Sequence, residues 1–107
     1  MHEQSVQAAA RREKRAVPWY MDNIGQNVER VQTGVRIEKR LLKVLKAVAD
    51  LHDITLGDLL EGIVLHAFEG KVPFDDQSLA KIAELKGIFG LDLTADDSHR
   101  LVEEIPS

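Results

Sequence analysis

Cysteine is absent from the 107 residues, and aromatic residues are scarce at 5% of the chain. Without cysteine the chain forms neither disulfides nor thiolate metal sites, which fits a reducing compartment. No apolar run approaches the roughly 18 residues needed to span a bilayer, and residues 1–17 lack the apolar stretch of a signal peptide. We therefore expect a soluble cytoplasmic protein with no membrane partner.

Motifs for enzymatic chemistry are also missing. The chain contains neither of the glycine-rich phosphate-binding patterns, GxGxxG and GxxxxGK[ST]. Its four histidines show no metal-ligand spacing beyond a lone His66-x-x-Glu69, and a surface or packing role explains them better. The run Asp97-Ser98-His99 has the residue types of a catalytic triad, but neighbours in sequence do not form a triad's geometry. We expect no enzyme, no catalytic residue, no metal and no cofactor.

Length and charge describe one small domain with an uneven surface. The 44% apolar and 30% charged residues are typical of a globular chain, and this length supports one modest core. The net charge of -4 is unevenly distributed. Residues 1–40 carry eight basic and five acidic side chains, whereas 41–70 carry two and five and 71–107 carry four and eight. All the positive excess therefore lies before residue 41.

Residues 1–30 read as a basic N-terminal arm followed by an aromatic connector. Residues 1–17 have helix-forming composition with little apolar periodicity, so we interpret them as an arm without a role in the core. Its basic side chains are Arg11, Arg12, Lys14 and Arg15. In residues 18–30, Trp19 and Tyr20 lie between Pro18 and Gly25, which indicates an irregular connector that packs its aromatic rings.

Residues 31–70 change from a strand pattern to two helix patterns. In residues 32–37 the side chains alternate, so that Thr33, Val35 and Ile37 share one face of a predicted strand. After Glu38 an apolar stripe with helical spacing predicts a helix that ends near residues 52–53. Thr55 is the predicted N-cap of the next helix, and Gly70 is its predicted C-cap. That second stripe comprises Leu56, Leu59, Leu60, Ile63, Val64, Ala67 and Phe68.

Residues 71–107 form a predicted C-terminal helical extension. A third helix is expected to stop at residues 87–90, and Thr94 is the expected cap of a short fourth helix. We expect the apolar residues of the third helix to lie on the helices of the dimer derived below rather than in water. These residues are Leu79, Ile82, Leu85, Ile88 and Phe89.

The single predicted strand needs a partner strand, because backbone donors and acceptors in a sheet must be paired. Pairing it antiparallel with the same strand of a second copy satisfies both copies about a two-fold axis. One face of this ribbon covers the helices, and the other displays Gln32, Gly34 and Arg36 twice. A two-stranded ribbon fits the DNA major groove, where Arg and Gln make two-pronged contacts with guanine and adenine edges.

At these residues the chain resembles the ribbon-helix-helix superfamily of DNA-binding proteins, the Arc, MetJ and CopG type. The matching pieces are the strand "TGVRI", the link "EKR", the helix "LLKVLKAVADLHD", the turn "ITLGDLL" and the helix segment "EGIVLHAF". The resemblance covers residues 31–70 and implies a mostly α fold, a ribbon-helix-helix dimer carrying extra C-terminal helices. This chain departs from the family where Asp53 replaces the usual turn glycine, and Asp58 stands near the expected phosphate site.

The resemblance also implies roles for particular residues. The outward strand residues Gln32, Gly34 and Arg36 would contact bases, and the amides of Thr55, Leu56 and Gly57 would contact phosphate. We further expect phosphate contacts from the link and the arm. These contacts involve Lys39, Arg40, Arg11, Arg12, Lys14 and Arg15.

Two functions follow from this reading. The first is a dimeric DNA-binding transcriptional regulator whose partner is double-stranded DNA. The second is a dimeric protein-interaction module or antitoxin-like adaptor without strong DNA binding, which holds a protein partner through residues 71–107. The acidity of the C-terminal half favours the second function.

Overall fold

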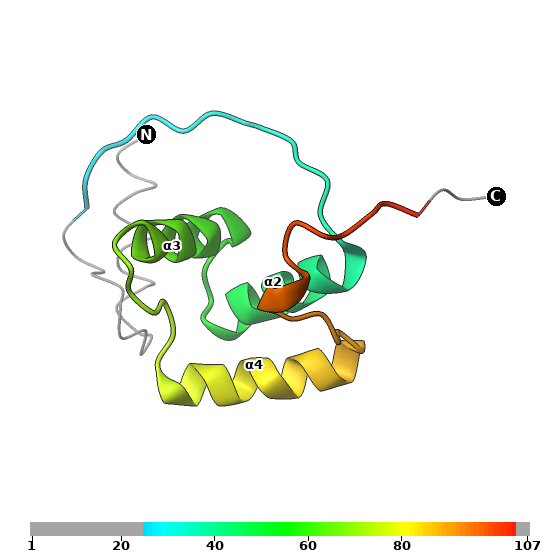
Figure 1. The fold of residues 1–107 in the computed structure, drawn as a ribbon. Helices are drawn as coiled ribbons and strands as arrows, with labels where there is room; N and C mark the ends of the chain where they lie inside the picture. Colours follow the sequence, from blue (N-terminus) through cyan, green and yellow to red (C-terminus); the bar gives the residue numbers. More distant parts are fainter. Residues whose placement is uncertain (1–24, 105–107) are drawn as a thin grey trace.

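The computed structural model describes residues 25–104, and the predicted arm and aromatic pair lie outside that range. Within it the regular elements are helical, in the order α2 (Lys39–Leu51), α3 (Leu56–Phe68), α4 (Asp76–Phe89) and the short 3-10 helix η1 (Ala95–Asp97). Helix α2 packs against both α3 and α4, while residues 25–38 follow an open path past α3 to the start of α2 (Figure 1). The prediction of a mostly helical fold is confirmed.

Helix α2 follows the predicted apolar stripe and ends where the sequence indicated. The Glu38 carboxylate accepts a hydrogen bond from the Leu41 amide at 2.8 Å and so caps the first turn. Asp53 adopts a positive φ of 59°, and the Ile54 amide donates back to the Ala49 carbonyl at 3.0 Å. This is the bonding pattern in which a left-handed residue closes a helix. Asp53 therefore occupies the conformation that the family usually gives to glycine.

Helix α3 begins and ends at the predicted residues. Thr55 is its N-cap, with its hydroxyl accepting from the Asp58 amide at 3.0 Å. At the other end Gly70 has a φ of 69°, and the Lys71 amide donates to the His66 carbonyl at 2.8 Å. The left-handed residue that terminates α3 is thus Gly70, directly after the last helical turn.

Helix α4 lies along α2 and buries part of its predicted apolar face. Ile82, Leu85 and Phe89 pack against the core, at spacings of three and four residues. Leu79 and Ile88 are 44% and 72% exposed in the single chain. The other three residues form the row of α4 that packs on the core.

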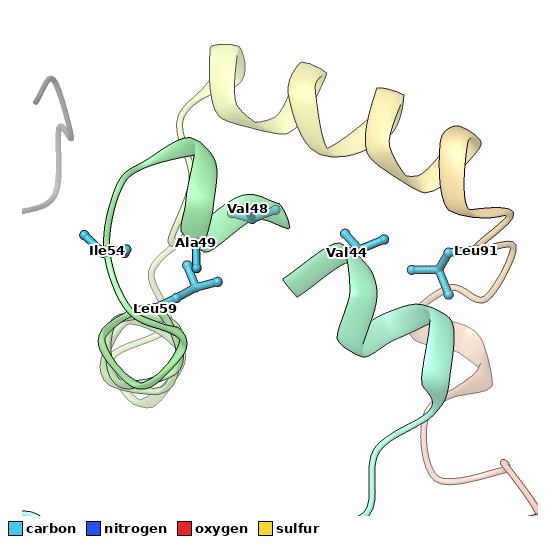
Figure 2. Packing of buried hydrophobic residues seen from close by; sticks show 6 residues of the cluster. All are labelled: Val44, Val48, Ala49, Ile54, Leu59 and Leu91. Atoms are coloured by element: carbon cyan, nitrogen blue, oxygen red, sulfur yellow. The ribbon is translucent and has the colours of Figure 1, made fainter. Parts of the chain in front are cut away.

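The core is small and centred on α2. Figure 2 shows Leu59 of α3 beside Ala49 of α2, and Leu91 facing Val44 across the end of α4. The buried apolar residues among those described are Val44, Val48, Ala49, Ile54, Leu59 and Leu91. Leu59 is the most deeply buried of them, with no exposed surface. The centre of this core is therefore the contact of α2 with α3 and with the chain that follows α4.

The expected short fourth helix is a single 3-10 turn, residues 95–97. Thr94 does cap it, and the Asp97 side chain accepts from the Thr94 amide at 2.8 Å. The chain then leaves the helical conformation, with ψ of 136° at Ser98 and φ of 67° at His99. Leu101 and Val102 follow as adjacent, exposed residues, so they form no stripe that packing could hold in a helix.

The predicted strand is not formed inside a single described chain. Residues 31–37 carry neither helix nor strand in the part of the chain that the structure covers. A ribbon made by two copies would leave this segment unpaired in one copy alone, so its open path is compatible with the prediction.

Among residues 25–104 no helix is long and apolar enough to cross a membrane.

We predict opposite effects for two glycines near the end of α4. Gly90→Ala should lower the free energy of unfolding by about 1 kcal/mol or more, because Gly90 has a φ of 67° that a Cβ disfavours. The matched control Gly87→Ala should raise it by about 0.5 to 1 kcal/mol, because Gly87 lies within the helix and an added Cβ meets nothing within 4 Å. Urea unfolding at one protein concentration measures both changes, and equal effects would contradict the assigned end of α4.

Candidate nucleic-acid interface

The segment that precedes α2 exposes both of its predicted faces. Residues 31–36 are all exposed, including the apolar Val31 at 79% and Val35 at 74%. The expected base-contacting residues Gln32 and Gly34 lie on this segment, and a Cβ added to Gly34 would meet nothing within 4 Å. The apolar residues of this segment are thus left in water by the single chain, although their alternation is typical of a half-buried strand.

Arg36, the third expected base-contacting residue, is paired with a carboxylate far away in the sequence. Its Nε donates to Oε1 of Glu103 at 3.0 Å, and its second guanidinium nitrogen contacts Oε2 of the same side chain. The pair lies on the surface, with side chains that are 82% and 61% exposed. The hydrogen bonds from Arg36 hold the pKa of Glu103 below its ordinary value. Arg36 therefore already has a two-pronged partner within the chain.

Arg40 ties the start of α2 to the end of α4. Its guanidinium donates to the Glu38 carboxylate at 2.9 Å, to the Gly90 carbonyl at 2.9 Å and to the Asp92 carboxylate at 3.0 Å. The neighbouring Lys39 is exposed at the first position of α2. Of the two expected phosphate contacts in the link, Lys39 points to solvent and Arg40 is engaged within the molecule.

The start of α3 combines the expected phosphate-binding amides with acidic side chains. The amides of Leu56 and Gly57 belong to the first turn and donate to no acceptor in residues 25–104. Asp58 and Glu61 follow on the same helix, and Arg30 contacts both of them. Arg30 donates twice to the Glu61 carboxylate, at 2.8 Å each, and once to Asp58 at 3.3 Å.

The Arg30 contacts join residues 25–38 to α3, and they offset negative charge in the first turns of that helix. They raise the pKa of Arg30 and lower that of Glu61, chiefly through the side-chain hydrogen bonds between them. The contacts of Arg30 could not be predicted from the sequence, because Arg30 lies 31 residues from Glu61 and outside any recognisable motif.

The expected site residues do not form one cluster in a single chain. Arg36 is joined to the C-terminal segment and Arg40 to the end of α4, and no hydrogen bond links Gln32, Gly34 or Arg36 to residues 55–57 within the described range. The basic residues Arg11, Arg12, Lys14 and Arg15 lie outside the residues that the structure describes.

Apolar surface is exposed in two places on the helices. On α3, Val64, Leu65 and Phe68 are exposed, with Phe68 at 81%. A groove of about 370 Å³ opens between α2, α4 and the chain that follows α4. Its apolar lining includes Leu41, Val44, Leu45, Val48, Ile63, Phe74, Ile82, Leu91, Leu93 and Leu101. Most of the lining comes from residues adjacent to the core, so the groove extends the core to the surface.

Among residues 25–104 no group of three or more histidine, aspartate or glutamate side chains is placed to hold a metal ion. Comparisons with protein-family models, with curated proteins and with solved structures find no match to this chain. The geometry and charge of the chain itself are therefore the basis for a functional proposal.

The Arg30 contacts give a prediction for pH dependence. Arg30→Ala should return the pKa of Glu61 toward its ordinary value, measured by a carboxyl NMR titration, whereas Arg100→Ala should leave it unchanged. A lowered pKa in the folded state stabilises the fold above the ordinary glutamate pKa, and that stabilisation is lost as the pH falls through the lowered value. Because both side chains are about half exposed or more, the loss should not exceed about 1 kcal/mol.

An unchanged Glu61 titration in Arg30→Ala would contradict the assigned contact. An equal shift in Arg30→Ala and Arg100→Ala would show that net charge, rather than this pair, sets the Glu61 pKa.

Proposed function

We propose that the chain is a homodimeric DNA-binding protein of the ribbon-helix-helix type, acting as a transcriptional regulator. Residues 31–37 of two copies form an antiparallel ribbon, and the ribbon enters the major groove of double-stranded DNA. The observation that carries this proposal is the open, exposed, apolar-alternating segment directly before two helices joined by a left-handed turn at Asp53.

The uncovered apolar surface supports the choice of a second copy as partner. Val31 and Val35 on the segment and Val64, Leu65 and Phe68 on α3 are exposed in one chain. Covering such side chains stabilises an assembly by about 25 cal/mol for each Å² of apolar surface removed from water. A two-fold dimer provides both a partner strand for the segment and a cover for the helices, so one association meets both needs.

The distribution of charge supports DNA as the ligand. The basic excess of the sequence lies in residues 1–40, and the proposed ribbon, residues 31–37, belongs to this basic part. In the dimer, Gln32, Gly34 and Arg36 face the base edges, and Lys39 with the amides of residues 55–57 contacts the backbone. Arg11, Arg12, Lys14 and Arg15 reach flanking phosphates. Arg30 favours phosphate at the start of α3, because it offsets the negative charge of Asp58 and Glu61.

Arg36→Ala tests the base contact directly. After selection of a preferred site from random DNA, the substitution should weaken binding by about 1 to 3 kcal/mol per copy and relax the preference at one base pair of each half-site. The matched control Arg100→Ala removes the same charge from an exposed position outside the ribbon and should preserve the preference. Electrophoretic mobility shift at two salt concentrations measures both effects.

Other outcomes assign Arg36 differently. An equal loss of affinity on all sequences, with a salt slope reduced by about one per copy, would make Arg36 a phosphate contact. Tight DNA binding that is insensitive to both Arg36→Ala and Gln32→Ala would contradict insertion of the ribbon into the groove.

A second candidate function is a dimeric interaction module or antitoxin-like adaptor that holds a protein partner through residues 71–107. The observation that favours it is the engagement of Arg36 and Arg40 by carboxylates of that extension, Glu103 and Asp92. A protein that remains dimeric yet retains no DNA from a random pool at low salt would favour this function over the first.

A further inference from the structure

The C-terminal segment reaches back to the residue on which the proposed base contact depends. Glu103 is 67 residues from Arg36 in the sequence, yet its two carboxylate oxygens accept from two nitrogens of the guanidinium. This is the two-pronged geometry in which arginine binds carboxylates. A guanidinium also binds O6 and N7 of guanine in the major groove with two donors. Because Nη2 belongs to both edges of the guanidinium that offer two donors, Arg36 cannot make both two-pronged contacts in full at once.

We propose that Glu103 is a built-in competitor of DNA at Arg36, so that the C-terminal segment lowers the affinity of the ribbon for its site. The inference rests on the proposed function and names its regulation. In the free dimer each Arg36 is held by a carboxylate, and DNA binding requires each pair to open. Any event that removes Glu103 from Arg36 raises DNA affinity without a change in the ribbon itself.

Contacts of the extension place Glu103 near α2. Leu91 is buried in the core, Leu93 is packed against it, and Leu101 lines the groove beside α2. Asp92 is held by Arg40 at 3.0 Å, and the Thr94–Asp97 capping box shapes the turn between them and the last residues. A segment held to the core by Leu91 and Leu93 keeps the carboxylate of Glu103 at a raised local concentration around Arg36. Loss of this segment therefore differs from loss of a free anion in solution.

The strength of the pair sets the size of the effect. Both side chains are largely exposed, and exposed ion pairs shift an equilibrium by up to about fivefold. Two copies in a dimer give a combined limit of about 25-fold when the two pairs act independently. The effect therefore tunes affinity and does not block binding. It should also shrink as salt is added, because salt screens charges at an exposed site.

Four full-length variants test the competitor in one binding experiment on the selected DNA. Glu103→Gln should bind about two- to fivefold more tightly per copy than the unmodified chain at low salt. Glu104→Gln is the matched control, because it removes the same charge from the adjacent residue, which has no contact with Arg36 in the described range. Arg36→Ala and the double variant Arg36→Ala/Glu103→Gln complete a cycle in which the gain from Glu103→Gln should disappear.

Each alternative result assigns the failure to one proposal. Equal gains in Glu103→Gln and Glu104→Gln, or a gain that persists without Arg36, would overturn the competitor while leaving DNA binding in place. If no variant binds DNA at low salt, the proposed function fails and the competitor fails with it.

Discussion

Burial of one face of α2 organises the described part of the molecule. Val48 and Ala49 of this helix are almost completely buried. Helix α3 packs on one side of α2, and α4 packs on another. Leu91 extends that cover past the end of α4, and Arg40 fastens the same region through Gly90 and Asp92. The C-terminal extension is therefore part of the core of a single chain rather than an independent tail.

The cover on α2 and α3 is incomplete in one copy, and this links the fold to the proposed function. A chain of this length supports only a modest core, so apolar side chains left in water represent a substantial part of the available stabilisation. Phe68 on α3 and Val35 on the open segment are both more than two-thirds exposed. In the proposed dimer, association of two copies would cover such residues and pair the backbone of residues 31–37 in the same event. Dimer formation and ribbon formation are consequently one process in this account.

Local chemistry made most of the helical fold predictable. Thr55 and Thr94 predicted helix starts, and both residues are N-caps in the structure. The helix that follows Thr94 has only one turn. The family resemblance, rather than the apolar pattern, indicated Asp53 as the residue at the position of the usual turn glycine, and φ there is 59°. The pairs Arg36–Glu103 and Arg40–Asp92 could not be predicted, since they join exposed charges 67 and 52 residues apart and no periodic pattern marks them. The exposure of Ile88 was missed because an apolar residue in a helix does not reveal which row faces a neighbour.

Disulfide scanning across residues 31–37 tests the central claim most directly, because the chain contains no cysteine of its own. In an antiparallel pair about a two-fold axis, a cysteine near the axis lies opposite its own copy, whereas one at an end lies roughly 20 Å from it. We predict rapid covalent dimers for Gly34→Cys, at the centre of residues 31–37, slow ones for Val31→Cys, and a dimer mass by light scattering for the unmodified chain. A monomer mass, together with equally slow cross-linking at both positions, would contradict the proposed ribbon.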